Sequence, residues 1–524
     1  MKLFDLGKIS KKPDQMMFYL GGPGGTGKSA VLKAFTSYLE NLGLRHKLRI
    51  GAHTGTAAKN VGGSTLHTLL ALPMTNKAGK DKPQQTSEQT QKDFETCEIF
   101  FTDEISMVGC GQLSQISSTM QKLTGKTLLP FGGVHMIFAG DFYQLLPNDP
   151  LFKKPQPTRN ENLTRQNMGY TLWSQMNHCI FLKTQYRMQE EDYKEIVHRF
   201  RHGESRDSDE MYFKERQLSV TNRLDEGRLS TLPTDPTIIV QWNKVKHEIN
   251  LAKAVQMSGE TGRKLLFSVA RDSCSNQTLN PRIIRDLLLL HDSTATKFLA
   301  GLLPLIVGMP VMFKHNLGTE LGITNGTMGH IVKIQLDPRE TVDWTTNSAH
   351  YLRYFPTAVY ALLSDVGTDK DGNEMIYFQL PGLPPNVFPV TTSNTPLKTN
   401  KCRQYFKYKD QKISYDIIRT QLNLLPAWAI TVNSSQGRSM DSAIIDLEGQ
   451  YSSSTKPYVM ISRLRFGSNM GVLGSWSEDL FRLSPDETMI AHTNDFLLPL
   501  EQRTLNNLAR IVRQLKTFQR LLTN

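Results

Sequence analysis

The chain has 524 residues, of which 39% are hydrophobic and 21% are charged. This composition is typical of a globular protein, and the length indicates about three domains. Lysine and arginine number 61 against 49 aspartates and glutamates, giving a formal net charge of +12, which is compatible with a polyanionic partner. No apolar run approaches the roughly 20 residues of a membrane span, and the N-terminus lacks the apolar stretch of a secretory signal. The five cysteines are scattered without a C-x-x-C pair, which excludes a zinc ribbon and a disulfide framework.

The segment Gly22–Ser29, GPGGTGKS, fits the phosphate-loop pattern G-x-x-x-x-G-K-[ST]. It lies between Met16–Leu20, predicted as a strand, and Ala30–Leu39, predicted as a helix. In such a loop the backbone N–H groups surround a phosphate, the lysine adds positive charge and the hydroxyl is placed on Mg²⁺. A plain glycine turn is the alternative, but the strand and helix favour nucleotide binding. The predicted nucleotide-binding residues are Gly22, Gly24, Gly25, Thr26, Gly27, Lys28, Ser29 and Ala30.

Two carboxylates end a second apolar run, CEIFFTDEISM at Cys97–Met107. Downstream of a phosphate loop, Asp103 is predicted to hold Mg²⁺ together with Ser29, and Glu104 is predicted to polarise the attacking water. An isolated Asp-Glu pair often caps a helix instead, so the catalytic interpretation depends on the loop before it.

Three further side chains complete the predicted site for hydrolysis. Gln144 follows the apolar run Val134–Ala139, and the carboxyl ends of parallel strands are where ligands collect. Its amide is therefore expected to bond the γ-phosphate or the lytic water. Arg187 and Arg463 follow the first and second α/β patterns, and each is a candidate for neutralising charge in the transition state.

The chain alternates apolar runs with helical patterns, which predicts parallel sheets in α/β domains. The pattern returns at Thr237–Val240, Ala429–Val432 and Ala443–Asp446, around a stretch rich in Gly, Pro and β-branched residues. Polar loops are expected at 75–93 and 148–169. The predicted parts are a first α/β domain at 1–185, a second at 186–306 and 426–475, a β-rich insertion at 307–425 and a helical extension at 476–524.

The C-terminal pattern predicts a helix with one apolar face. Leu505, Leu508, Val512 and Leu515 share that face, and the helix is expected to dock on the second domain.

With these residues in place, the chain resembles superfamily-one helicases and, within them, the Pif-one-like DNA helicase family. GPGGTGKS resembles helicase motif I, and DEISM at Asp103–Met107 has this family's form of motif II. The other resembling segments are Gly55–Leu70 (motifs Ia and Ib), Pro130–Pro147 (motif III), Gln185–Arg187 (motif IV), Trp428–Leu447 (motif V), Tyr458–Arg465 (motif VI) and Leu305–Val332, which leads into the family's small β-barrel.

The resemblance implies two RecA-like P-loop domains with parallel sheets, the second carrying a β-rich small-barrel insertion. It implies ATP and Mg²⁺ between these domains and single-stranded DNA across them, with 5′→3′ movement that unwinds DNA junctions with a 5′ tail. The expected roles are in DNA repair, recombination and telomere maintenance. The protein is expected to act as a monomer in the nucleus, with the mitochondrion as the alternative.

Further residue roles follow from the resemblance alone. Gln436 and Gly437 are expected near the γ-phosphate, and the loop at 75–93 falls where the family carries a small wedge. Hydroxyls and amides hold DNA phosphates without reading bases. The expected DNA-binding residues are Thr56, Thr65, His67, Thr431 and Asn433.

The chain departs from the family pattern at two informative places. The residues before Gly22 show no convincing counterpart of the family's adenine-contacting glutamine, and Ser434 stands where the family usually has a lysine. Two alternatives therefore stay open: a helicase domain from a rolling-circle (Helitron-type) transposon, and a degenerate nucleic-acid-binding remnant without turnover. A P-loop switch or kinase is disfavoured by Glu104 and Arg463.

Overall fold

The structure is a computed structural model that describes residues 14–72, 88–156, 162–218, 232, 236–274, 278–291, 295–346, 348–364, 375–397 and 416–523. Most of the predicted wedge-like loop at 75–93 lies outside these residues, and only α4 (Glu88–Glu95) at its end is described. The chain forms two compact units. Unit 1 comprises residues 1–210, 451–465 and 478–524, and unit 2 comprises 211–450 and 466–477.

A six-stranded sheet forms the centre of unit 1, in the order β3-β2-β4-β5-β1-β6. Every neighbouring pair in it is parallel, which confirms the predicted α/β architecture. Because helices cover a parallel sheet on both faces, its strands are apolar runs rather than alternating patterns. The strands are β1 (Met17–Gly21), β2 (Leu48–Ala52), β3 (Ser64–Thr65), β4 (Ile99–Asp103), β5 (His135–Gly140) and β6 (His178–Phe181).

Helices connect these strands. The polar loop predicted at 148–169 is wrong from residue 162 onward, because those residues form a helix. That helix packs closely on α5: a Cβ on Gly169 would lie 1.8 Å from the carbonyl oxygen of Cys110. The helices are α1 (Lys28–Asn41), α2 (Gly55–Asn60), α3 (Leu66–Leu69), α5 (Cys110–Thr124), α6 (Asn162–Trp173), α7 (Glu191–His202), α14 (Thr455–Ile461), α15 (Glu487–His492) and α16 (Leu498–Thr523), with α8 (Asp207–Lys214) crossing into unit 2.

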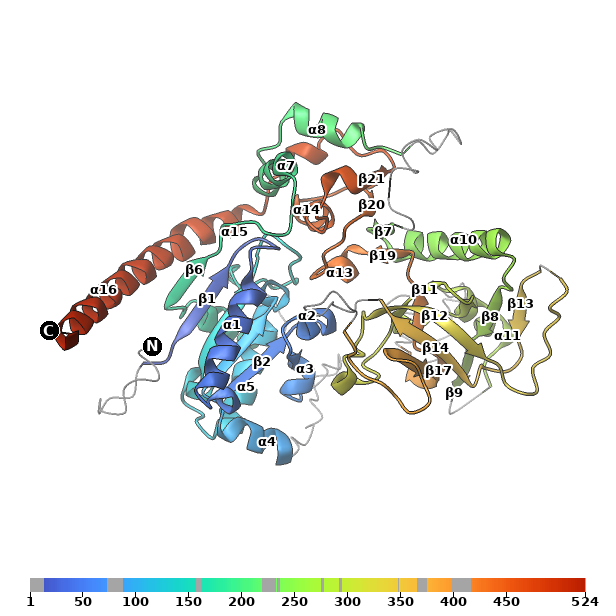
Figure 1. Ribbon diagram of the computed structural model, residues 1–524, viewed down its shortest axis with the longest axis horizontal. Helices are drawn as coiled ribbons and strands as arrows, with labels where there is room; N and C mark the ends of the chain where they lie inside the picture. Colours follow the sequence, from blue (N-terminus) through green and yellow to red (C-terminus); the bar gives the residue numbers. More distant parts are fainter. Residues whose placement is uncertain are drawn as a thin grey trace. The chain divides into compact units, whose positions relative to one another are not determined.

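The C-terminal helix α16 belongs to unit 1, so its expected docking on the second domain is wrong. It lies along β6, an edge strand of the sheet, and supplies acceptors for that strand's free N–H groups (Figure 1). Glu501 Oε1 accepts from Phe181 N at 2.7 Å, and Thr504 Oγ1 accepts from Cys179 N at 3.1 Å. The helix thus protects a sheet edge through polar side chains. The predicted apolar face is exposed at Leu505, Leu508 and Val512.

A neutral histidine joins α15 to the core of unit 1. Trp173 is fully buried, and its Nε1 donates to His492 Nε2 at 3.0 Å. That nitrogen accepts only when it carries no proton, and burial lowers the pKa of His492 to about 4. The segment from 478 onward is therefore held by a contact that needs neutral histidine.

This contact predicts a loss of stability in mild acid. Because the pKa of His492 is lower in the folded than in the unfolded chain, its contribution is complete above pH 6.5 and is lost as the pH falls toward 4. We expect His492→Gln, which keeps an acceptor but does not titrate, to reduce this loss by at most about 3 kcal/mol. Urea unfolding at pH 7 and pH 4.5 measures the loss of unfolding free energy in each variant. His46→Gln, at an exposed histidine, is the control. Equal pH dependence in both variants would contradict the assignment.

Unit 2 contains a second parallel sheet, in the order β19-β7-β20-β21, so the second predicted α/β pattern is also confirmed. Its strands are β7 (Thr237–Val240), β19 (Ala429–Thr431), β20 (Ala443–Asp446) and β21 (Met470–Leu473), and the helices beside it are α10 (Asn243–Thr261) and α13 (Val432–Ser435).

The β-rich insertion begins earlier than the predicted 307–425, because its first strand is β8 at residue 266. It contains a five-stranded antiparallel sheet, in the order β15-β14-β12-β11-β18. Two three-stranded sheets, β16-β17-β9 and β10-β8-β13, extend it. The elements are β8 (Leu266–Val269), β9 (Arg271–Cys274), α11 (Pro281–Leu289), β10 (Leu302–Leu305), β11 (Pro310–Phe313), β12 (Met328–Gln335), β13 (His350–Leu352), β14 (Ala358–Leu363), β15 (Val387–Val390), β16 (Thr392–Pro396), β17 (Ile417–Leu422) and β18 (Leu424–Pro426).

The two units do not follow the boundaries predicted from the sequence. Residues 186–210 and 451–465 carry α7 and α14, which contact each other inside unit 1, whereas the sequence pattern places both in the second domain. No helix among the described residues is long and apolar enough to cross a bilayer.

Candidate active site

The loop Gly22–Ser29 connects β1 to α1, as predicted. Gly22, Gly25 and Gly27 have φ angles of 148°, 91° and 91°, a range that side chains rarely adopt, so the turn requires glycine. Lys28 Nζ donates to the carbonyl oxygens of Gly22 and Pro23, at 2.7 and 2.9 Å. The lysine is thus folded over the loop, where an anion at the N-terminus of α1 would meet it.

The sheet order brings the other predicted residues to the same edge. β1 lies between β5 and β6, and β4 lies on the far side of β5. The phosphate loop after β1 is therefore flanked by the residues after β5, which include Gln144, and by those after β6, which lead to Arg187. Asp103 ends β4.

Three polar side chains converge on Gly24 of the loop. A Cβ at this position would lie 2.9 Å from Arg187 Nη1, 3.2 Å from Arg463 Nη2 and 3.3 Å from Gln144 Nε2. Gln185 Nε2 also donates to the carbonyl oxygen of Gly24, at 2.8 Å. Residues separated by more than 400 positions in places thus lie around one glycine, and a side chain at this position would displace the ends of these three side chains.

The two arginines form a pair of positive charges, with Arg463 buried and Arg187 half-buried. Arg187 Nη1 donates to the carbonyl oxygen of Ser462 at 2.9 Å, and Arg463 Nε donates to that of Val459 at 2.8 Å. Burial, and then the charge of Arg463, lower the pKa of Arg187 to about 9. Arg187 Nε is buried and has no hydrogen-bond partner among the described residues. Because like charges in a buried place disfavour each other, this pair fits an anion such as a polyphosphate.

The carboxylates after β4 have the environment of a catalytic site. Burial, and then the charge of Glu104, raise the pKa of Asp103 to about 7, while Lys28 opposes this rise. Glu104 has φ 53° and ψ 45°, a left-handed conformation that costs energy in a residue with a side chain. Strain of this kind is concentrated at functional sites.

The described residues contain no group of three or more His, Cys, Asp or Glu side chains suited to a metal ion. Mg²⁺ beside phosphates usually takes only one or two protein ligands, so the hydroxyl of Ser29 and the carboxylate of Asp103 fit that chemistry. Their assignment as metal ligands stays a prediction.

The predicted DNA-binding residues fall in both units. In unit 1, Thr65 caps α3 by accepting from Thr68 N at 3.3 Å, while Thr56 lies in α2 and His67 in α3. In unit 2, Thr431 precedes α13 and Asn433 lies in it. Gln436 and Gly437 directly follow α13, and the role expected for them stays a prediction.

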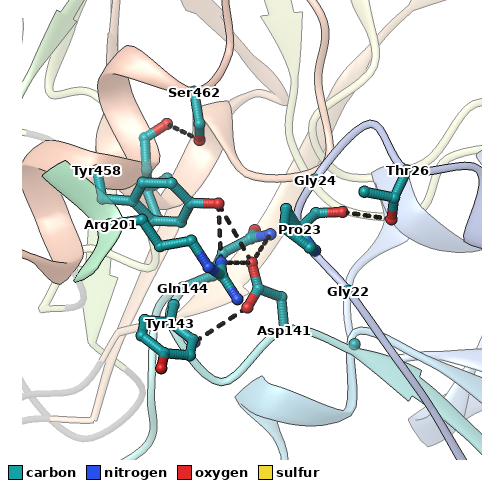
Figure 2. Close-up of polar contacts among 12 residues, drawn as sticks. Gly22, Pro23, Gly24, Thr26, Asp141, Tyr143, Gln144, Arg201, Tyr458 and Ser462 are labelled. Carbon is teal, nitrogen blue, oxygen red and sulfur yellow. Dashed lines mark hydrogen bonds and ion pairs between the residues drawn. The ribbon is translucent and has the colours of Figure 1, made fainter. Parts of the chain in front are cut away.

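Sequence reasoning missed four side chains that the structure singles out. Asp141, Arg201 and Tyr458 form a buried network with Gln144 (Figure 2). The aspartate beside Gln144 was a visible signal, whereas nothing in the sequence connects it to Arg201. Trp242 is 56% exposed at the carboxyl end of β7.

The fold and the site together define a P-loop NTPase. A parallel sheet carries the phosphate loop after its first strand, carboxylates after β4 and an amide after β5, and two arginines face the loop.

Comparisons with known proteins then find similar proteins in one family. The family model described as PIF1-like helicase matches residues 4–208. The chain is 27% identical to the ATP-dependent DNA helicase PIF1 of Saccharomyces cerevisiae over 62% of this chain and 34% of that protein. It is 25% identical to the ATP-dependent DNA helicase Pif1 of a Psychrobacter species over 87% of this chain and 65% of that protein. The resemblance to the Pif-one-like family is confirmed, and the chain is related to the PIF1-like helicases, although it spans less than two thirds of these two relatives.

Solved structures agree with the fold. A crystal structure of Bacteroides Pif1 bound to single-stranded DNA aligns with a TM-score of 0.61 and 19% identity, over 92% of this chain and 93% of that one. Bacteroides Pif1 in complex with ADP-AlF3 and single-stranded DNA aligns with a TM-score of 0.60 and 20% identity, over 93% of this chain and 94% of that one. This likeness confirms two RecA-like α/β domains.

Proposed function

We propose that the chain is an ATP-dependent DNA helicase that moves along single-stranded DNA in the 5′→3′ direction and separates duplexes with a 5′ tail. The observation that carries this is the convergence of Gln144, Arg187 and Arg463 on Gly24 of the phosphate loop. Two guanidinium groups beside the loop, Arg463 buried and Arg187 half-buried, favour a site that also stabilises charge in a transition state. The names of the relatives support the activity.

Each site residue then has a chemical role. Lys28 and the loop N–H groups bind the phosphates of ATP, and Ser29 and Asp103 hold Mg²⁺, which neutralises phosphate charge when bound. Glu104 takes the proton of the attacking water. Arg187 and Arg463 stabilise the charge that develops on the transferred phosphoryl group, and Gln436 and Gly437 contribute from motif V.

The DNA would lie along Thr56, Thr65 and His67 of unit 1 and along Thr431 and Asn433 of unit 2. The excess of positive charge favours such a partner. Monomeric action, a role in DNA repair, recombination or telomere maintenance, and a location in the nucleus or mitochondrion are part of the same proposal.

The decisive experiment is ATP hydrolysis with and without single-stranded DNA, comparing the unaltered chain with Lys28→Ala. We expect DNA-stimulated turnover that Lys28→Ala abolishes. Lys33→Ala, at an exposed position of the same helix, is the matched control and should behave like the unaltered chain. DNA binding without turnover would favour the degenerate remnant instead. Unwinding of duplexes with a 5′ or a 3′ tail then tests polarity.

Trp242 is expected to stack on a DNA base. It follows β7, whose neighbour β19 ends at Thr431, and a Cβ on Gly449 would lie 3.9 Å from its Nε1, so the loop after β20 supports the indole. Stacking on an aromatic side chain contributes about 1–3 kcal/mol per base, so Trp242→Ala should weaken oligo-dT binding about 5- to 150-fold. Fluorescence anisotropy measures this.

Two controls separate stacking from other effects at Trp242. Trp242→Phe keeps an aromatic face and should retain most of the affinity. Trp344→Ala removes an indole that is 65% exposed in the insertion and should leave binding unchanged. Equal affinity of Trp242→Ala and the unaltered chain would remove Trp242 from the interface.

A further inference from the structure

A buried network of side chains holds Gln144 in place (Figure 2). Asp141 follows β5, and its Oδ2 accepts from Gln144 Nε2 at 3.1 Å and from Arg201 Nη1 at 2.5 Å. Arg201 Nη1 also donates to the hydroxyl of Tyr458 at 2.9 Å. The network thus joins the loop after β5 to α7 and α14, which lie far from it in the sequence.

The ion pair at its centre is shielded from water. The side chains of Arg201 and Asp141 are 8% and 1% exposed, and the Arg201 guanidinium lies 3.9 Å from the centre of the Tyr143 ring. Burial alone would raise the pKa of Asp141, but the charge and hydrogen bond of Arg201 lower it below the usual range. Arg201 therefore keeps Asp141 as a carboxylate.

A carboxylate fixes the orientation of the neighbouring amide. Asp141 can only accept hydrogen bonds, so Gln144 must present its Nε2 group to it. Gln144 Oε1 therefore cannot take Asp141 as its partner. This oxygen is buried and accepts no hydrogen bond from any described residue, and a buried acceptor without a donor is costly.

The missing partner of Gln144 Oε1 must be a donor. A water molecule has protons to donate, whereas the outer phosphate oxygens of a nucleotide bound to Mg²⁺ are acceptors. We propose that Asp141, Arg201 and Tyr458 act as positioning residues that turn the Gln144 oxygen toward the attacking water, an inference that rests on the proposed ATPase function.

The test is a double-mutant comparison of ATP hydrolysis at saturating single-stranded DNA. Losing a buried hydrogen bond to a charged group corresponds to about a 10- to 100-fold fall in rate. We expect such a fall in kcat for Gln144→Ala and for Arg201→Met, with KM for ATP little changed. Because Arg201 acts through Gln144, the double variant should be no slower than Gln144→Ala alone.

Milder variants test the orientation of the amide itself. Asp141→Asn can donate to Gln144 Oε1 and should lower kcat as much as Arg201→Met does. Tyr458→Phe removes only one hydroxyl and should cost less, and Arg201→Lys should be intermediate. Arg199→Met is the matched control, because it breaks another ion pair of α7, to Asp209 at 2.6 Å, and should leave kcat unchanged.

The outcomes separate this inference from the proposed function. An unaltered chain without DNA-stimulated hydrolysis refutes the function itself. Two results in an active chain would overturn the positioning role alone. One is that the losses of kcat from Arg201→Met and Gln144→Ala multiply in the double variant. The other is that Asp141→Asn and Tyr458→Phe keep full activity. Affinity for a fluorescent ADP analogue shows that each variant still folds and binds nucleotide. If Arg201→Met does not fold, the kcat values of Asp141→Asn and Tyr458→Phe test the positioning role instead.

Discussion

Replacing Glu104 by glutamine is expected to lower kcat for DNA-stimulated ATP hydrolysis by about 10²–10⁴-fold. The amide has the size of the carboxylate but does not take a proton from water at neutral pH. Glu104 lies at the end of β4, in a left-handed conformation with φ 53°, next to the buried Asp103. The substitution changes neither the loop nor the arginines beside it, so nucleotide and DNA binding should persist.

Single-turnover hydrolysis measures this effect, and a filter-binding assay with labelled single-stranded DNA measures binding. Glu98→Gln is the matched control, because Glu98 precedes the same strand and pairs with Lys47 at 2.7 Å on the surface. That control should hydrolyse ATP like the unaltered chain. If Glu104→Gln retained most of its turnover, another group would have to accept the proton, and the assignment of the catalytic base would be wrong.

The part of this fold that could be predicted from sequence is the part that depends on local pattern. Buried parallel strands are continuous apolar runs, so β1, β4 and β5 were found within about two residues. The phosphate loop was found because its glycines, lysine and hydroxyl are fixed by the geometry of binding a phosphate. Residues directly after those strands, such as Asp103 and Gln144, followed from the rule that parallel strands end at one edge of a sheet.

What could not be predicted depends on contacts between distant segments. Arg201 lies on the face of α7 that meets Asp141, but any arginine of an amphipathic helix has the same local pattern. For the C-terminal helix, the local pattern predicted a contact that the structure does not show. The apolar stripe of this helix pointed to docking through Leu505 and Leu508. The helix docks instead through Leu500, which is buried in the core, and through Glu501 and Thr504, which bond the N–H groups of the edge strand. The spacing of apolar residues in a sequence predicts the apolar face of a helix. It does not show which polar side chains will bond the free N–H groups of a neighbouring strand.

A fully buried ion pair of unit 2 has no sequence signature either. Arg419 of β17 and Asp272 of β9 lie directly opposite each other in the register of their sheet. Both side chains are 0% exposed and form two hydrogen bonds of 2.8 Å. Arg419 also donates to the carbonyl oxygens of Leu299 and Leu287, at 3.0 and 2.8 Å. The guanidinium thus links two strands to α11 and the segment before β10.

Removing the carboxylate is therefore expected to destabilise unit 2 strongly. Asp272→Ala leaves a buried guanidinium without its counter-charge, and breaking a buried pair in this way costs about 3–5 kcal/mol. We expect the urea transition of unit 2, followed by tryptophan fluorescence, to move to lower urea accordingly. Arg339→Met breaks an ion pair of the same insertion whose arginine is 68% exposed, and should leave the transition in place. The double variant Asp272→Leu with Arg419→Met removes both charges, so it should recover much of the lost stability. If Asp272→Ala unfolds at the same urea concentration as the unaltered chain, this pair does not hold the insertion together.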